Sequence, residues 1–186
     1  MLNETLRFSS KETLDGLIKI AIGIVLLCIL SPIKLGAGTQ VPITLQSMLV
    51  VLLPIVFGWK NGALAVLIYL ILGGMGLPVF AEYSSGWSKF MGTSGGFLLG
   101  FLVAANIVGF FAQKDFRMQA LAALILLVLG QLTILGMGLF WMSGIVQQEI
   151  NYANQLESFM PGVLLKSAFG MILFVALSRL AKYTSK

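Results

Sequence analysis

Lys166 is the residue whose type and position best suit binding chemistry in this sequence. It lies within an apolar segment, about residues 162–181, that is long enough to cross a membrane. A charge near the middle of a bilayer costs at least about 2.5–3.5 kcal/mol and commonly marks a functional site. Lys166 lies five residues after Pro161, so its Cα is about 7 Å into the predicted helix, and a buried ammonium there suits a small carboxylate or a carbonyl oxygen as its ligand. The alternative is that the side chain snorkels to the membrane surface.

Few other polar side chains fall inside the apolar segments. Thr44 and Gln46 open the second segment, Asn106 lies in the fourth and Gln131 lies in the fifth. Polar groups within membrane spans often hydrogen-bond between helices, and this is the simplest interpretation of Asn106 and Gln131. Gln46 lies nearer the predicted outer face, where a pocket can form.

A glycine-rich stretch, Gly92-Thr-Ser-Gly-Gly-Phe97, surrounds the predicted start of the fourth segment. The first turn of a helix offers unpaired N–H groups and a positive dipole end. Gly95 and Gly96 would let an anionic group of a ligand approach that backbone closely. The same glycines, together with Gly100, also fit close packing of one helix against another.

The connection between the third and fourth segments carries four aromatic side chains, Phe80, Tyr83, Trp87 and Phe90. Aromatic residues gather at membrane–water interfaces, so a belt at the bilayer surface is one interpretation. The other is a lid or wall for a flat, partly apolar ligand. Long connections on one face of a protein favour recognition at that face.

The overall composition is that of a membrane protein. Of 186 residues, 58% are hydrophobic and 10% are charged, whereas a soluble domain is about 25% charged. The chain has no histidine and one cysteine, Cys28, which excludes an internal disulfide, a Ser-His-Asp triad and Cys/His zinc spacing. We therefore expect no enzymatic activity, no catalytic residue, no cofactor and no metal site.

Six apolar segments approach the length of about 20 residues that a membrane-spanning helix needs. The second and third are the shortest, and the polar pair Lys60-Asn61 separates them. Pro54 is expected to kink the second segment. The sequence thus predicts one all-α integral membrane domain over residues 1–186, with six spans at about 14–32, 43–58, 62–76, 93–113, 118–143 and 162–181.

The positions of the basic residues predict how this domain lies in the membrane. With the N-terminus placed in the cytoplasm, nine of the twelve lysines and arginines fall on the inside, Lys34 and Lys89 fall in outside loops, and Lys166 falls within the last span. Because cytoplasmic loops carry an excess of Lys and Arg, both termini are predicted to be cytoplasmic. This pattern explains the net charge of +5 without a nucleic-acid partner.

Four motifs in this sequence resemble the BioY family in order and spacing. The resemblance covers most of the chain, from the second span to the sixth. The motifs are Val41-Pro-Ile-Thr-Leu-Gln46, Gly73-Gly-Met-Gly-Leu-Pro-Val-Phe80, Gly92-Thr-Ser-Gly-Gly-Phe-Leu-Leu-Gly-Phe101 and Pro161-Gly-Val-Leu-Leu-Lys166.

The resemblance implies a fold, a function and partners. BioY proteins are the biotin-binding substrate-capture subunits, or S components, of energy-coupling factor transporters. A six-helix S-component fold in a bacterial plasma membrane is therefore implied, with biotin held near the outer face and taken up by the cell. The family normally works with a transmembrane coupling subunit and two cytoplasmic ATPases, although some members are proposed to act alone. The chain itself has no G-x-x-x-x-G-K-[ST] loop for ATP.

The shape of biotin fits the residues singled out above. Biotin has apolar fused rings, a ureido group with two N–H donors and a carbonyl acceptor, and a carboxylate tail. Aromatic walls, a few hydrogen-bonding groups and one cation suit such a molecule, and a buried ureido group needs polar partners. The predicted ligand-binding residues are Thr44, Gln46, Phe80, Glu82, Tyr83, Gly95, Gly96, Phe97, Asn106, Val163 and Lys166.

Two positions depart from the family pattern. Family members usually read Pro-Gly-Asp-x-x-Lys in the last helix, which places the acid beside the lysine on one helical face, but here the position holds Val163. An outer-loop acid, Glu82, Glu149 or Glu157, takes its place, or the ligand is held differently, or the same fold binds another small carboxylate or vitamin. In the first helix, Ala21 is followed by Val25 rather than by the second alanine of the A-x-x-x-A pattern at which S components meet the coupling subunit.

Overall fold

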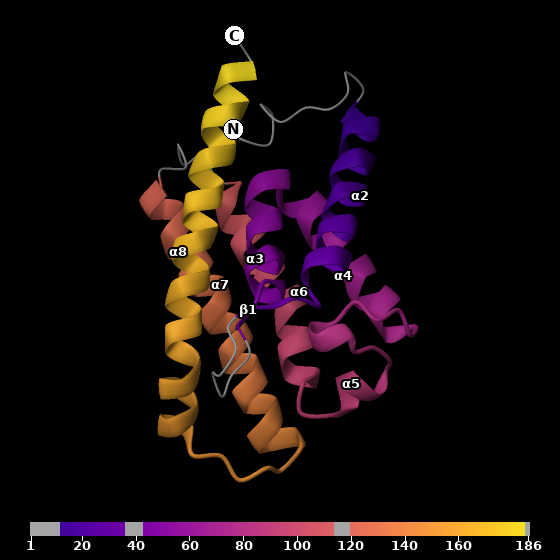
Figure 1. The fold of residues 1–186 in the computed structure, drawn as a ribbon, viewed down its shortest axis with the longest axis vertical. Coiled ribbons are helices and arrows are strands. Elements are labelled where there is room, and N and C mark those ends of the chain that lie inside the picture. Colours follow the sequence, from indigo (N-terminus) through magenta and orange to yellow (C-terminus); the bar gives the residue numbers. More distant parts are fainter. Residues whose placement is uncertain (1–11, 36–42, 114–119, 185–186) are drawn as a thin grey trace.

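The polypeptide folds into a bundle of helices with one short β-hairpin (Figure 1). The computed structural model describes residues 12–35, 43–113 and 120–184. β1 (Lys34–Leu35) pairs antiparallel with β2 (Ile43–Thr44). The connections include the 3-10 turn η1 (Ala81–Tyr83) and the π-helical turn η2 (Trp141–Ile145). The helices are α2 (Glu12–Leu30), α3 (Gln46–Phe57), α4 (Trp59–Gly74), α5 (Ser88–Met91), α6 (Gly95–Ala112), α7 (Ala120–Phe140) and α8 (Tyr152–Thr184).

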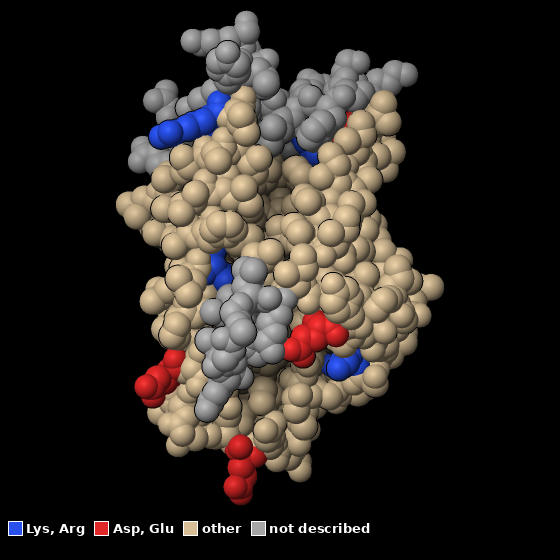
Figure 2. All heavy atoms as spheres, in the orientation of Figure 1, with Lys and Arg blue, Asp and Glu red and all other residues tan. Residues whose placement is uncertain are grey.

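Four stretches of helix are long and apolar enough to cross a membrane, and two shorter apolar helices, α3 and α4, accompany them. The outward faces of the long helices carry large apolar side chains, as expected for contact with lipid. On the face shown in Figure 2, the zone between the two ends of the molecule is mostly uncharged, with a small area of Lys or Arg atoms near mid-height. The long stretches are α2, α6, Ala120–Ile145 and Tyr152–Leu180.

The shortest of the six main helices, α3, forms the centre of the bundle. All twelve of its residues are buried, because α2, α4, α6, α7 and α8 all pack against it. Two glycines allow the neighbours to approach closely: a Cβ on Gly62 would meet the backbone of Pro54, and one on Gly130 would meet Val51. Pro54, expected to kink the segment, lies inside the continuous helix Gln46–Phe57.

The break between α3 and α4 lies at Gly58, two residues before the predicted Lys60-Asn61 break. Gly58 has φ +87°, a conformation that side chains with a Cβ rarely adopt. It ends α3 and lets α4 begin directly at Trp59. The physical signal is therefore a helix-ending glycine, and Lys60 and Asn61 belong to the first turn of the next helix.

The last helix begins ten residues earlier than the predicted span at 162. The side-chain oxygen of Asn151 accepts a hydrogen bond from the backbone N–H of Asn154 at 3.2 Å, which caps the first turn. The helix then continues through Pro161. As a result Lys166 lies about 21 Å along α8 from Tyr152 at about 1.5 Å per residue, and not within its first turns.

The two ends of the bundle differ in what they carry. At the terminal end, the upper end in Figure 1, α2 begins and α8 ends. At the loop end, the lower end in Figure 1, lie α5, the end of α7 and the start of α8. In Figure 2 the acidic side chains of this face gather mainly toward the loop end.

Candidate ligand-binding site

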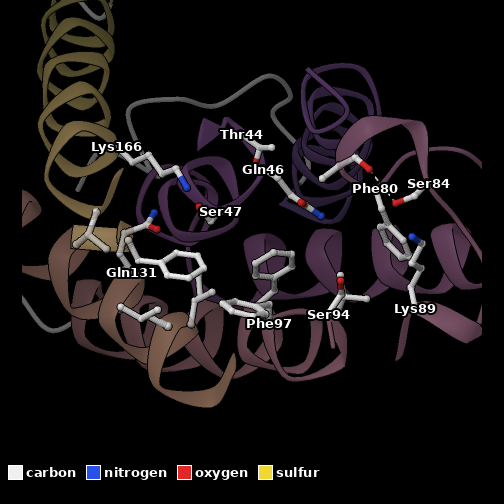
Figure 3. Close-up of a pocket in the computed structure, with 17 residues that line it drawn as sticks. Thr44, Gln46, Ser47, Phe80, Ser84, Lys89, Ser94, Phe97, Gln131 and Lys166 are labelled. Carbon is white, nitrogen blue, oxygen red and sulfur yellow. Dashed lines mark hydrogen bonds between the residues drawn. The ribbon is translucent and has the colours of Figure 1, made fainter. Parts of the chain in front are cut away.

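A pocket with a volume of about 250 Å³ opens between the start of α3, the chain around η1 and α5, and the helices α6, α7 and α8 (Figure 3). Its volume approaches the lower end of the range of about 300–1,000 Å³ typical of small-molecule sites. It is lined by Thr44, Gln46, Ser47, Phe80, Ala81, Ser84, Lys89, Ser94, Phe97, Leu98, Phe101, Gln131, Ile134, Leu135, Phe159, Val163 and Lys166.

One corner of the pocket gathers polar groups from three helices. Lys166 of α8, Ser47 of α3 and Gln131 of α7 lie together there (Figure 3), and we call these three residues the Lys166 corner. Ser47 is 7% and Gln131 is 4% exposed. Within the described residues, neither the Ser47 hydroxyl nor the Gln131 amide nitrogen has a hydrogen-bond partner. Buried polar groups normally have one, so this corner is suited to a polar ligand group.

A buried hydrogen-bond chain holds the amide of Gln46 at the pocket. Gln46 Nε2 donates to the hydroxyl oxygen of Tyr69 at 2.7 Å, and that hydroxyl donates to the carbonyl of Val79 at 2.9 Å. Tyr69 is fully buried. The chain links α3, α4 and the segment that leads into η1, so it fixes the orientation of the Gln46 side chain relative to this wall of the pocket.

Phe80 forms an apolar wall and is itself held by aromatic neighbours. Its ring packs edge-on against Tyr69, with centroids 5.6 Å apart, and against Phe90, with centroids 5.9 Å apart. A Cβ on Gly73 would collide with the Phe80 ring, so the glycine is needed for this packing. The result supports the interpretation of the loop aromatics as a wall in the case of Phe80, which is 3% exposed.

On the opposite wall, Phe97 of α6 stacks on Phe159 of α8. Their ring centroids are 5.8 Å apart and the rings are inclined by 26°. Val163 packs one turn further along α8 with Leu135 and Leu139 of α7. No acidic side chain is among the described residues that line the pocket, so the position of the family's acid next to Lys166 is apolar here.

Six of the eleven predicted ligand-binding residues line the pocket, and five do not. Those brought together are Thr44, Gln46, Phe80, Phe97, Val163 and Lys166. Asn106 lies elsewhere because its side-chain oxygen accepts a hydrogen bond from Trp59 Nε1 at 3.0 Å and its amide donates to Leu102 O. This is the helix-to-helix role that the simpler interpretation gave it.

The other four residues outside the pocket lie at or near its rim. Glu82 and Tyr83 are exposed, and both have φ +57°, which directs this turn outward from the wall that Phe80 forms. Gly95 and Gly96 serve packing: a Cβ on either would collide with Trp141, and with Phe90 O or Met137 O respectively. The close-packing interpretation of these glycines is therefore the one that the structure supports.

Eleven of the residues that line the pocket were not among the predicted ligand-binding residues. Ser47, Phe159 and Lys89 are among them, Gln131 was assigned to helix packing, and Tyr69 acts from behind the wall. The sequence gives no local sign of this arrangement. Ser47 and Gln131 are far apart in sequence, and they lie near Lys166 only because α3, α7 and α8 pack together. No group of three or more possible metal ligands gathers among the described residues.

Known proteins are similar to this chain in sequence and in the arrangement of their helices. Residues 4–183 match the sequence model of the BioY family. The chain belongs to the BioY family. It is 34% identical to the biotin transporter BioY2 of Lactococcus lactis subsp. cremoris over 177 residues, which cover 91% of this chain and 96% of that protein.

Further similarities extend over nearly the whole chain. The probable biotin transporter BioY of Rickettsia prowazekii is 26% identical over 97% of this chain and 93% of its own. The solved structure of the S-component for biotin from an ECF-type ABC transporter matches with a TM-score of 0.78 and 26% identity, over 94% of this chain and 95% of that chain. The protein is thus a membrane protein with the S-component fold and belongs to a transporter family, not to an enzyme family.

Proposed function

We propose that this BioY-family protein binds biotin in the pocket of Figure 3 for uptake across a bacterial plasma membrane. The observation that carries the proposal is the Lys166 corner, where two buried polar groups without partners in the described chain meet a lysine beside aromatic walls. An apolar pocket with a few convergent polar groups is typical of a small-molecule site. The relatives named as biotin transporters supply the identity of the small molecule.

The hydrogen-bonding capacity of the Lys166 corner matches the ureido group of biotin. Lys166 and the amide nitrogen of Gln131 are donors for the carbonyl oxygen, whose two lone pairs can accept both. The hydroxyl of Ser47 and the amide oxygen of Gln131 are acceptors for the two N–H groups. Satisfying these buried atoms offsets the cost of taking the ureido group out of water. Phe80, Phe97 and Phe159 then enclose the fused rings.

The proposed topology has six crossings with both termini in the cytoplasm and the loop end outside. The proposal rests on the excess of basic residues predicted for the inner side and on α2 and α8 sharing the terminal end. It gives biotin access from outside, next to η1 and α5. The short α3 and α4, enclosed by the longer helices, complete the six-helix domain over residues 1–186.

For transport, we propose the S-component role, with a coupling subunit and two ATPases as partners. The solved structure that this fold matches is the S-component for biotin from an ECF-type ABC transporter. The exposed side of α2, which includes Ala21 and Val25, is the surface proposed for the coupling subunit. Co-purification from native membranes tests this: recovery of a coupling subunit and ATPases supports it, and recovery of the protein alone supports a stand-alone transporter.

Val163 favours a second candidate, the same fold with a different small carboxylate or vitamin as ligand. It is 6% exposed and packs with Leu135 and Leu139 beside Lys166, so the ligand meets an apolar surface where the family motif places an acid. A thermal-shift panel of vitamins separates the two candidates. Stabilisation by another vitamin but not by biotin would establish the second.

Calorimetric titration of the purified protein with biotin tests the proposed function. The expected result is saturable binding at one site per chain, together with a rise in the unfolding temperature, because a ligand that binds only the folded state stabilises it. Ser47→Ala and Gln131→Leu are expected to weaken binding, whereas Asn106→Leu, outside the pocket, serves as the control for the loss of a helix-borne amide. No heat change and no thermal shift with biotin would refute the proposal.

A further inference from the structure

We propose that Lys89 is a second ligand-binding cation of this site, which binds the carboxylate of the ligand while the Lys166 corner holds its uncharged head. This inference rests on the proposed function, since it assigns the two ends of the biotin molecule to the two ends of the pocket. It concerns a residue outside the four motifs that resemble the family. Lys89 contributes to the pocket from α5, at the opposite end from Lys166 (Figure 3).

The position of Lys89 is set by the packing of its short helix. Its backbone N–H donates to Gly86 O at 3.1 Å, and the N–H of Gly92 donates to Ser88 O at 3.0 Å. The next residue, Phe90, packs against Phe80 of the pocket wall. Lys89 is half-buried and reaches the end of the pocket that Phe80 and Ser84 also line (Figure 3). The backbone of Lys89 is thus fixed by the short helix, and its side chain lines the pocket.

The charged residues that line the pocket favour an anionic ligand group at the end where Lys89 lies. Two lysines line the pocket and no acidic side chain among the described residues does so. Lys89 forms no ion pair with any of the described residues. A ligand with a single carboxylate neutralises one of the two lysines, and the other needs an uncharged acceptor. A charged hydrogen bond to a carboxylate is worth more than one to a neutral group.

The other polar groups decide which lysine receives the carboxylate. Beside Lys166, the unpartnered Ser47 hydroxyl and Gln131 amide are more than nine-tenths buried and match a neutral group with both donors and acceptors. Burying a carboxylate costs more than burying a neutral polar group. Lys89 lies in the connection at the loop end, outside the long helices, where a carboxylate keeps contact with water. The ureido head therefore goes to Lys166 and the carboxylate tail to Lys89.

The experiment compares two ligands that differ only in the charge of the tail, biotin and biotinamide, by calorimetric titration of the full-length protein. The native protein is expected to prefer biotin over biotinamide by about 10- to 150-fold, since a hydrogen bond to a charged group is worth about 1.5–3 kcal/mol. In Lys89→Gln this preference is expected to disappear, with the affinity for biotinamide unchanged. Lys89→Arg is expected to keep the preference, and Lys60→Gln, exposed at the terminal end, is the neutralised control.

Each outcome decides a separate question. If Lys89→Gln still prefers biotin as strongly as the native protein does, Lys89 does not bind the carboxylate and the inference is overturned. Loss of the preference in Lys166→Gln but not in Lys89→Gln would assign the carboxylate to Lys166. If the native protein binds neither ligand, the proposed function itself fails. Lys89→Met provides a second neutral variant if Lys89→Gln does not fold, and thermal unfolding of each variant verifies the fold.

Discussion

The two walls of the pocket are built in different ways. The wall from α3 and the segment before η1 belongs to the core: every residue of α3 is buried, and Gln46 is held by the fully buried Tyr69. The wall from α8 comes from a helix at the edge of the bundle, whose other face exposes large apolar side chains such as Phe169. Changes in the first wall should therefore alter stability and binding together, and changes in the second should alter binding alone.

The largest effect expected from the α8 wall is that of Lys166→Met. Removing the ammonium leaves the ureido oxygen short of a charged donor, so the affinity for biotin is expected to fall by about 100-fold. The free energy of unfolding should not fall, because a half-buried charge is itself costly within a membrane span. Titration calorimetry and thermal unfolding in detergent measure the two quantities. If the free energy of unfolding fell together with the affinity, the α8 wall would not differ from the α3 wall in its contribution to stability.

In the α3 wall, Tyr69→Phe should change both quantities. The variant leaves Val79 O without the hydrogen bond from the tyrosine hydroxyl and Gln46 Nε2 without its acceptor. We expect an unfolding free energy lower by about 1–3 kcal/mol and a weaker binding of biotin, because the Gln46 amide loses its fixed orientation. Tyr83→Phe, at an exposed position, is the matched control and should change neither. Binding loss with unchanged stability would argue against the core character of this wall.

Val163→Asp tests whether the ureido group of biotin lies beside Lys166 on the α8 wall. An acid at this position lies one turn before Lys166 on the same helical face and adds an acceptor for a ureido N–H group. The affinity for biotin is expected to rise by about tenfold, as for one additional charge-assisted hydrogen bond of about 1.4 kcal/mol. Val163→Asn has the same shape without the charge and should give a smaller gain. Weaker biotin binding by the aspartate variant would place the ureido group away from Lys166.

Phe159→Leu is the mildest of these changes. It removes the stacking of Phe159 on Phe97, and an aromatic pair is worth about 0.5–1.5 kcal/mol beyond its buried area. Biotin binding should weaken by about 2- to 10-fold, with little change in stability. Phe169→Leu, on the outward face of the same helix, should leave the affinity as it is. Equal effects of the two substitutions would mean that Phe159 acts only through the packing of α8.

The sequence predicts the helices better than their ends. The six predicted apolar segments correspond to α2, α3, α4, α6, α7 and α8. They were predictable because a helix needs apolar residues whether it faces lipid or the core of the bundle. The start of α8 depends on a local cap from Asn151 within a polar stretch, which hydrophobicity does not reveal. The β1–β2 pairing also escaped prediction, since strands of two residues carry no periodic pattern.

The site was predictable where a residue is unusual for its surroundings. Lys166 stands out as a charge in an apolar segment, and Gln46 and Val163 stand out through the motifs that resemble the family. Ser47 and Gln131 do not stand out, because a serine or glutamine in a span commonly hydrogen-bonds to a neighbouring helix. Only the packing of α3, α7 and α8 shows that they lie together without partners in the described chain.

A structure of the protein with bound biotin tests the central claim most directly. We expect the ureido group among Ser47, Gln131 and Lys166, the fused rings between Phe80 and the Phe97–Phe159 pair, and the carboxylate next to Lys89. Biotin bound outside this pocket, or with its ureido group remote from Lys166, would contradict the proposed binding mode.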